Sequence, residues 1–169
     1  MDVETAIRLR RTHKQYGADP LDRTELLELL DLARWAPNHH LTQPWRFRVL
    51  GAETRAALEE AVGEKEAAKL RRAPTLVLAT ALLTGDAETD EEDLHATACA
   101  VYAVLLGATA RGLANYWRTP HALHDGAVRE LLGVEPAERV VALIHLGPAE
   151  SEPPAKERAP FEEVVAFLP

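Results

Sequence analysis

Hydrophobic residues recur along the chain at two spacings, and these predict two kinds of element. Hydrophobic positions three or four residues apart follow Asp2 and Asp22, and aspartate is a residue that caps helix N-termini. The second of these helices is expected to end before Pro37, because proline cannot continue a helix. The same spacing predicts three later helices, of which the middle one is hydrophobic on most faces and is expected to be central and buried: residues 53–62, 94–113 and 122–132.

Four shorter segments have the patterns of strands. In residues 45–49 tryptophan, phenylalanine and valine alternate with two arginines, which predicts a half-buried strand. The hydrophobic run at 75–82 suits a central strand, the nearly continuous run at 140–146 predicts another, and residues 114–117 predict a short one. Residues 85–93 contain six acidic side chains and are expected to form a mobile surface loop.

The C-terminal segment changes character twice. Residues 147–160 are rich in proline and in charged side chains. Hydrophobic residues then follow in a short tail: Phe161, Val164, Val165, Phe167 and Leu168. A hydrophobic tail after a polar loop needs a surface to bury against, so docking is expected, for example on a second subunit.

Length and composition predict a single globular domain over residues 1–169. Hydrophobic residues make up 47% and charged residues 27%, which excludes a disordered, collagen-like or disulfide-stapled chain. The formal net charge of −8 argues against general binding to nucleic acid or to an anionic membrane. Neither a signal peptide nor a hydrophobic stretch of roughly 18 to 20 residues is present, so a cytoplasmic location is expected. The single cysteine, Cys99, lies in a hydrophobic run and is expected to be buried.

Several common catalytic and cofactor-binding motifs are missing from the sequence. The only serine, Ser151, lies beside prolines in an expected loop, which argues against a serine hydrolase with a nucleophile elbow. No glycine pair forms Gly-x-Gly, so neither a Rossmann fingerprint nor a P-loop is present. A cofactor that carries a phosphate would therefore have to be held by side chains.

Positive charge is concentrated near the N-terminus of this acidic chain. Arg8, Arg10, Arg11 and Lys14 fall within seven positions, with Thr12 among them. Guanidinium groups bind phosphate oxygens through paired hydrogen bonds, and a hydroxyl adds a further donor. The cluster therefore predicts an anion or phosphate site, while a solvated helix face is the alternative.

Two further segments combine residue types that bind ligands. Residues 36–45, Ala-Pro-Asn-His-His-Leu-Thr-Gln-Pro-Trp, form a proline-bracketed loop of hydrogen-bonding groups, for which a purely structural loop is the alternative. Residues 117–119, Trp-Arg-Thr, place an aromatic face and a cation at a strand end, which suits a planar anionic ligand but also occurs at ordinary strand ends. A third interpretation is a metal site formed by His39, His40, His121, His124 and Asp125. The sequence contains no cysteine pair and no His-Glu-x-x-His motif that would support it.

The N-terminal cluster and the proline-bracketed loop together resemble the nitroreductase family of FMN-dependent oxidoreductases, in its short single-domain branch. The match is Ala-Ile-Arg-Leu-Arg-Arg-Thr-His-Lys-Gln-Tyr at residues 6–16, followed by Ala-Arg-Trp-Ala-Pro-Asn-His-His-Leu-Thr-Gln-Pro-Trp-Arg-Phe at residues 33–47. The remaining elements also fit: an Ala-Pro before a hydrophobic strand at 73–74, a long central helix, the Trp-Arg-Thr segment, and a Leu-Gly-Pro turn followed by Lys156 and Arg158.

This resemblance implies an α+β fold, with a mixed, mainly antiparallel sheet flanked by helices. It implies a homodimer with FMN at the interface and a C-terminal extension over the partner. The implied activity is a ping-pong transfer of hydride from NADH or NADPH, through the flavin, to a small-molecule acceptor such as a nitroaromatic or a quinone. The flavin carries the chemistry, so no catalytic side chain is expected. An FMN-binding sensor or carrier with little turnover is the alternative.

The resemblance also assigns roles to individual residues. Arg10 and Thr12, with Arg11 adjacent, would hold the FMN phosphate or ribityl chain, and the tail would add Lys156 and Arg158. At the other end of the cofactor, Lys14 would lie near the pyrimidine edge of the flavin, where a positive charge stabilises the reduced ring. Two further groups would line the ring and complete the pocket: Pro37, Asn38 and His39, and Trp117, Arg118 and Thr119.

Three positions depart from the family pattern. Thr12 replaces the usual serine and keeps the hydroxyl. Leu41 stands where many relatives have an asparagine, so no polar contact is expected from it. Pro120 follows Thr119 where glycine is frequent, which would stiffen that loop. Arg8 has no counterpart and is expected to be surface charge.

Overall fold

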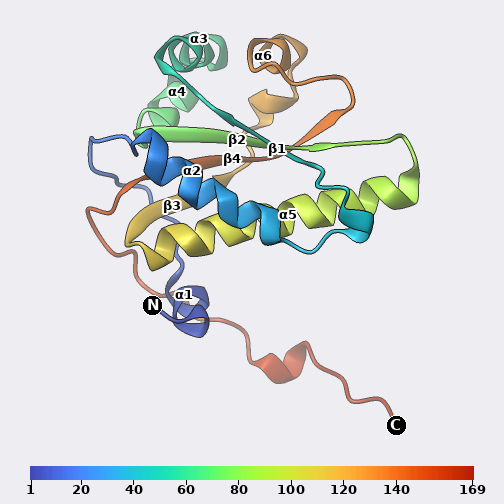
Figure 1. Cartoon of the computed structure of the whole chain (residues 1–169). Coiled ribbons are helices and arrows are strands. Elements are labelled where there is room, and N and C mark those ends of the chain that lie inside the picture. The colour runs from blue at the N-terminus through green and yellow to red at the C-terminus, as the bar shows by residue number, and fades with distance from the viewer.

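Four strands form one sheet, and helices cover both of its faces (Figure 1). The computed structural model describes residues 1–169. Every pair of neighbouring strands is antiparallel. This confirms the expected α+β fold with a mainly antiparallel sheet flanked by helices. The order across the sheet is β1-β2-β4-β3, formed by β1 (Trp45–Val49), β2 (Thr75–Leu82), β3 (Leu113–Arg118) and β4 (Glu138–Pro148).

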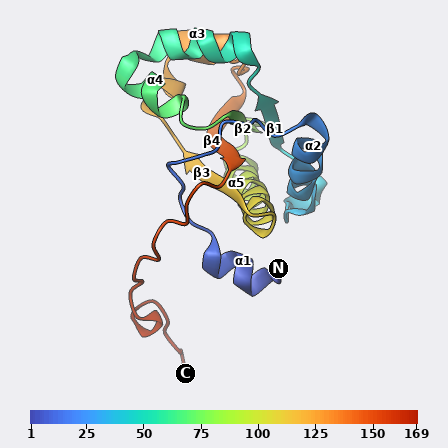
Figure 2. The same cartoon turned by 90° about the vertical axis from the view of Figure 1, so that its left-hand side faces the viewer.

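The helices form two layers. One layer consists of α5 (Ala87–Ala110) and α2 (Arg23–Asp31), and the opposite layer of α3 (Ala52–Val62), α4 (Glu64–Leu70) and α6 (Gly126–Leu131) (Figures 1 and 2). The first helix, α1 (Val3–Leu9), packs on α5 outside these layers. Short 3-10 turns occupy Leu32–Trp35, His39–Leu41, His121–His124 and Phe161–Glu163.

Helix starts predicted from the sequence are confirmed by their caps. The Asp2 carboxylate accepts a hydrogen bond from the backbone N–H of Thr5 at 2.9 Å, and that of Asp22 accepts one from Glu25 at 2.9 Å. Both bonds satisfy amides that an α-helix leaves without a partner at its N-terminus. Together they fix where α1 and α2 begin, and therefore where the basic cluster leaves α1.

The core lies on both faces of the sheet. Val77 and Ala79 of β2 are fully buried in a cluster with residues of α5 and α2. Leu76 and Leu78 point to the opposite face and pack with α3, α4 and α6. Because strand side chains alternate between faces, a continuous hydrophobic run is what a strand buried on both sides requires. The expectation of a central strand at 75–82 is confirmed.

Two expectations for the middle of the chain are wrong. The acidic segment 85–93 is not a loop, because α5 begins at Ala87, with Asp86 accepting a hydrogen bond from the N–H of Thr89 at 2.9 Å. Acidic side chains stabilise a helix N-terminus through the helix dipole, so this composition suits the first turns of a helix. Cys99 is exposed, because it lies on a face of α5 that the sheet does not cover.

Smaller differences concern two other helices. The helix α4 was not expected from the sequence. The helix expected over residues 122–132 is divided at Asp125, whose carboxylate accepts hydrogen bonds from the N–H groups of Ala127 and Val128 and so starts α6.

One helix has the length and hydropathy of a membrane span, which the sequence analysis did not anticipate. An 18-residue window of α5 has a mean hydropathy of 1.3. In the structure α5 packs along the sheet and contributes Ala100, Val101, Val104 and Leu105 to the core. The interior of this domain accounts for part of its hydrophobic character, since 44% of that window is buried.

The C-terminal segment extends away from the two layers, as Figure 2 shows. Its hydrophobic side chains are exposed, with Phe167 at 96% and Leu168 at 88% of full exposure. The tail finds no apolar surface within its own chain, so the expected docking onto another surface stays a prediction.

A buried ion pair connects the edge strand β1 to β4. The Arg48 guanidinium donates to both carboxylate oxygens of Glu138, at 2.8 and 2.7 Å, and the Thr80 hydroxyl donates to the same carboxylate. Burial alone raises the pKa of Glu138, but these hydrogen bonds outweigh it and hold the pKa below its ordinary value.

Substitution of Arg48 by methionine is expected to lower the free energy of unfolding at pH 7 by about 3 kcal/mol, because the Glu138 charge stays buried without its partner. A depressed folded-state pKa contributes stability above the unfolded-state pKa that is lost as the pH falls through the folded-state value. The difference between wild type and Arg48→Met in urea unfolding should therefore shrink in acid. The exposed Arg34–Asp31 pair supplies the control: Arg34→Met should change stability by less than about 0.5 kcal/mol. Equal losses in both variants would contradict the interpretation.

Candidate functional site

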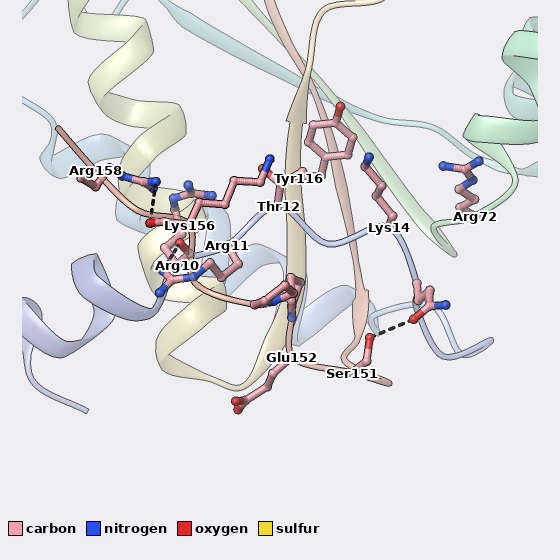
Figure 3. Close-up of a pocket in the computed structure, with 13 residues that line it drawn as sticks. Arg10, Arg11, Thr12, Lys14, Arg72, Tyr116, Ser151, Glu152, Lys156 and Arg158 are labelled. Atoms are coloured by element: carbon pink, nitrogen blue, oxygen red, sulfur yellow. Dashed lines mark hydrogen bonds between the residues drawn. The ribbon is translucent and has the colours of Figure 1, made fainter.

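The basic cluster lines a cavity of about 900 Å³ between the segment after α1, the end of β3 and the C-terminal segment (Figure 3). The expected cofactor residues that it brings together are Arg10, Arg11, Thr12, Lys14, Lys156 and Arg158. Residues 10–14 and 156–158 are far apart in the sequence, so only the fold places them around one space. The expectation that the tail approaches the basic cluster agrees with this arrangement.

Most cations of the cavity have no acidic partner. The side chains of Arg10, Lys14, Arg72 and Lys156 make no hydrogen bond or ion pair within the chain. The one acidic lining residue is Glu152, and in Figure 3 its carboxylate points away from Arg10 and Lys156. In a chain with a net charge of −8, this is a local concentration of unneutralised positive charge. Such a cavity attracts anionic ligands.

Arg11 differs from its neighbours. Its Nη1 donates to the backbone carbonyls of Arg8 and Arg10, at 2.5 and 3.0 Å. These carbonyls lie at the C-terminus of α1, where helices leave acceptors unsatisfied and where a cation is favoured. Arg11 thus lines the cavity, and part of its guanidinium caps the C-terminus of α1. Arg8 is exposed and does not line the cavity, as expected of surface charge.

The cavity has two chemically different ends. Arg10, Lys156 and Arg158 gather at one end, and Lys14, Tyr116 and Arg72 lie at the other (Figure 3). Thr12 lies between them with a free hydroxyl. Tyr116 is the one hydrophobic residue in the lining, so a single aromatic face is available to a flat ring.

The proline-bracketed loop does not reach this cavity within one chain. His39 Nδ1 lies 2.7 Å from Glu92 Oε2, and the Thr42 hydroxyl donates to Asp93 at 2.6 Å, so the loop sits near the N-terminus of α5. The basic segment lies near Thr109 at the other end of α5, because Asn115, which contacts His13, donates to the Thr109 hydroxyl. Thr109 lies seventeen positions after Glu92 in the same helix, which corresponds to about 25 Å along its axis. Pro37, Asn38 and His39 are therefore remote from their expected partners.

The backbone of this loop is held in an unusual conformation. His40, Leu41 and Gln43 all have positive φ, at 50°, 54° and 46°. Residues with a side chain adopt this region at a cost of order 1 kcal/mol or more each. The Asn38 side chain stabilises the turn, because its Oδ1 accepts from the Gln43 N–H at 2.9 Å and its Nδ2 donates to the Ala36 carbonyl at 3.0 Å. The Asn38 amide is thus engaged in shaping the loop.

The Trp-Arg-Thr segment is divided between the core and a second cavity. The Trp117 indole is half-buried against the core and donates to the Val141 carbonyl at 3.0 Å. Thr119 is exposed, and neither residue lines the large cavity. Arg118 is nine-tenths buried, is paired with Glu66 of α4 and points to the opposite face of the sheet from Trp117.

The second cavity, of about 170 Å³, adjoins the first and shares Lys14, Arg72 and Tyr116 with it. Its remaining lining includes Arg118, Lys69 and His145. The buried imidazole of His145 has its pKa lowered to about 3, first by desolvation and then by the charge of Arg118. His145 is therefore neutral at physiological pH.

The histidines of the metal interpretation do not converge. His121 and His124 face each other at 5.9 Å between ring centroids, while His39 stacks on His40 beside α5. No group of three or more histidine, cysteine, aspartate or glutamate side chains in the chain is arranged to hold a metal ion.

Sequence reasoning missed part of the lining. Gln15, Arg72, Tyr116, Ser151 and Glu152 all line the large cavity. Tyr116 could have been found from strand alternation, because it lies two residues before Arg118 on the same face of β3. Arg72 gave no local signal, since nothing in its neighbourhood indicates that the turn before β2 borders the N-terminal segment.

Comparison with known proteins identifies the family of this chain. The sequence profile of the nitroreductase family matches residues 7–148. The "Putative NAD(P)H nitroreductase YfhC" of Bacillus subtilis is 26% identical over 173 residues, which cover 93% of this chain and 89% of the relative. The solved structure of a nitroreductase-like family protein from Bacillus cereus superposes with a TM-score of 0.90 at 25% identity, over 99% of this chain and 96% of that one.

A further solved structure, from Desulfovibrio desulfuricans and determined in complex with FMN, has the same fold, with a TM-score of 0.82 at 24% identity. The match covers 99% of this chain and 96% of that protein. The family profile spans most of the chain, including the basic cluster, the proline-bracketed loop and all four strands. The chain belongs to the nitroreductase family.

Proposed function

We propose that this protein binds FMN in the large cavity and is an NAD(P)H-dependent flavin oxidoreductase. The observation that carries the proposal is the group of unpaired cations, from three distant segments, that surrounds one cavity of an otherwise acidic chain. The naming of YfhC as an NAD(P)H nitroreductase and the FMN complex of the Desulfovibrio protein support this assignment.

The lining residues fit the two ends of FMN. A phosphate dianion suits the end with Arg10, Lys156 and Arg158, because guanidinium and ammonium donors bind phosphate through short charge-assisted hydrogen bonds. The Thr12 hydroxyl, free of protein partners, suits the hydroxylated ribityl chain. A volume of about 900 Å³ is within the range of pockets for ligands of this size.

The residues at the other end would orient the ring and hold charge. When bound, the flavin supplies hydride acceptance and donation. Lys14 and Arg72 are unpaired cations at this end and would stabilise negative charge that develops on the ring. Tyr116 presents the aromatic face on which a flat ring can pack. No side chain has to act as general acid or base.

A second copy of the chain would complete the site. One chain offers Tyr116 as the only aromatic wall of the cavity, whereas ligand pockets are lined mainly by hydrophobic and aromatic side chains. The loop with Pro37, Asn38 and His39 lies too far away to form the second wall within the same chain. Large hydrophobic side chains are exposed beside it, among them Trp35 at 78% and Leu41 at 75%. A symmetric dimer would bury these side chains and bring the loop of one subunit over the cavity of the other.

The proposed reaction is ping-pong. NADH or NADPH delivers hydride and leaves, and an oxidised small molecule such as a nitroaromatic or a quinone then takes the electrons at the same place. Because the flavin face would be open to successive ligands, one cavity serves both half-reactions. A cytoplasmic location is part of this proposal, since both nicotinamide cofactors are available there.

Replacement of Arg10 by alanine is expected to weaken FMN binding by about tenfold or more, because a charge-assisted hydrogen bond to phosphate contributes roughly 1.5 to 3 kcal/mol. Arg8→Ala is the matched control, because Arg8 belongs to the same cluster but lies outside the cavity. FMN affinity is measured by quenching of flavin fluorescence. Equal affinities of the two variants would contradict the placement of the phosphate.

Anaerobic mixing with NADPH or NADH tests the enzymatic activity. We expect the absorbance of oxidised flavin to disappear rapidly and to return when a quinone or nitroaromatic is added. An oxidised spectrum that persists with both nicotinamides would instead support an FMN carrier or sensor with little turnover.

Complementation tests whether two subunits share a site. Arg10→Ala and His39→Ala chains are each expected to bind FMN weakly as homodimers. Mixed after reversible dissociation, they should form heterodimers in which one of two sites has both halves intact, so about a quarter of all sites recover. Sedimentation confirms the oligomeric state. A mixture that binds no more FMN than its components would show that His39 and Arg10 serve the same site in one chain or different functions altogether.

A further inference from the structure

The small cavity beside the main one contains two buried nitrogen atoms that lack a partner. They are Nη1 of Arg118 and Nε2 of His145. The Arg118 side chain is only 10% exposed and His145 only 1%. A buried donor without an acceptor is costly, and more so when it belongs to a charged group. Both residues line the same cavity of about 170 Å³.

The charges around this cavity do not balance. Glu66 accepts from Arg118 and, at 2.9 Å, from Lys69, so one carboxylate serves two cations. Lys14 and Arg72, at the boundary with the large cavity, have no acidic partner. Burial is the main cause of the lowered pKa of His145, and the positive charge of Arg118 lowers it further. The surplus of cations around the cavity, rather than this pKa, is what favours an anion.

We propose that the small cavity binds a small planar oxyanion, of the carboxylate or nitrate type, held by Nη1 of Arg118 and the ring of His145. The guanidinium fork presents N–H donors in a plane that matches two oxygens of such a group. Glu66 accepts from Nη2 of the guanidinium, which leaves Nη1 without a partner. A neutral imidazole has one N–H, and its Nε2–H tautomer supplies the second donor. Water in this cavity would leave the positive charge of the lining side chains unbalanced, whereas a monovalent anion would compensate that charge.

This ligand chemistry has two possible sources. One is a free anion from solution or the carboxylate of a larger ligand. The other is the oxygen-bearing edge of a cofactor that enters from the large cavity across Lys14 and Tyr116. Both present planar, negatively polarised oxygens to the same two donors. The test begins with flavin-free protein and therefore does not depend on the proposed function.

Sodium nitrate and sodium acetate are titrated into the full-length, flavin-free protein, with ionic strength held constant by the sodium salt of a bulky sulfonate buffer. Anion binding to the folded state alone should raise the thermal midpoint along a saturating curve. Isothermal titration calorimetry gives the affinity. Arg118→Met should weaken binding at least tenfold. Arg118→Lys keeps the charge and the pairing with Glu66 but loses the planar fork, and should also weaken it.

Arg139→Met is the control, because Arg139 is an exposed arginine of β4 outside the cavity and should leave the response unchanged. A response that is linear in salt, or equal in wild type and both Arg118 variants, would overturn the site. Titration of FMN-loaded protein then distinguishes the sources. A lost response assigns the two donors to the cofactor edge, and a retained response assigns them to a free anion. If FMN fails to bind while the anion binds, the proposed function fails and the anion site stands.

Discussion

The packing of α5 along one face of the sheet determines how far apart the functional segments lie. This helix contributes Ala100, Val101 and Val104 to the core and is too firmly buried to tilt without breaking it. Its N-terminal end holds the proline-bracketed loop through Glu92 and Asp93, and its C-terminal end adjoins the basic segment. The two motifs that carry the family resemblance thus adjoin opposite ends of one rigid element, where Glu92 and Thr109 lie about 25 Å apart along the helix axis. Under the proposed function they would form a single site between two chains.

The same helix explains where the hydrophobic surface lies. Its exposed face includes Cys99 and Tyr102, and the neighbouring segments expose Trp35, Leu41 and Ile7. Single exposed hydrophobic residues are ordinary, but a set that surrounds one helix supports the proposed dimer. The strained backbone of the loop fits this proposal, because the conformation of His40 and Leu41 is maintained at a cost in free energy.

Elements whose signal lies in neighbouring residues were predicted correctly from the sequence. Features that depend on tertiary contacts were not. Capping aspartates and strand patterns located α1, α2 and the four strands, because these depend on neighbouring residues. The start of α5 was missed because six acidic side chains resemble a solvated loop as much as a helix N-terminus. The basic cluster that contains Arg10 was predicted from its concentration of positive charge, and Lys156 and Arg158 were predicted through the resemblance. Arg72 reaches the cavity only through the path of the turn before β2, which no local signal indicates.

The least predictable element, α4, has the largest effect on the chemistry of the small cavity. Glu66 of this short helix pairs with Arg118, and Lys69 of the same helix lines the space. Without α4 the Arg118 guanidinium would be free to turn toward solvent. With α4 in place the pair fixes one edge of the guanidinium and leaves the other edge bare beside His145. A helix that the sequence pattern does not predict thus orients the Arg118 guanidinium at the end of β3. This orientation makes the cavity selective for planar anions, which positive charge alone would not do.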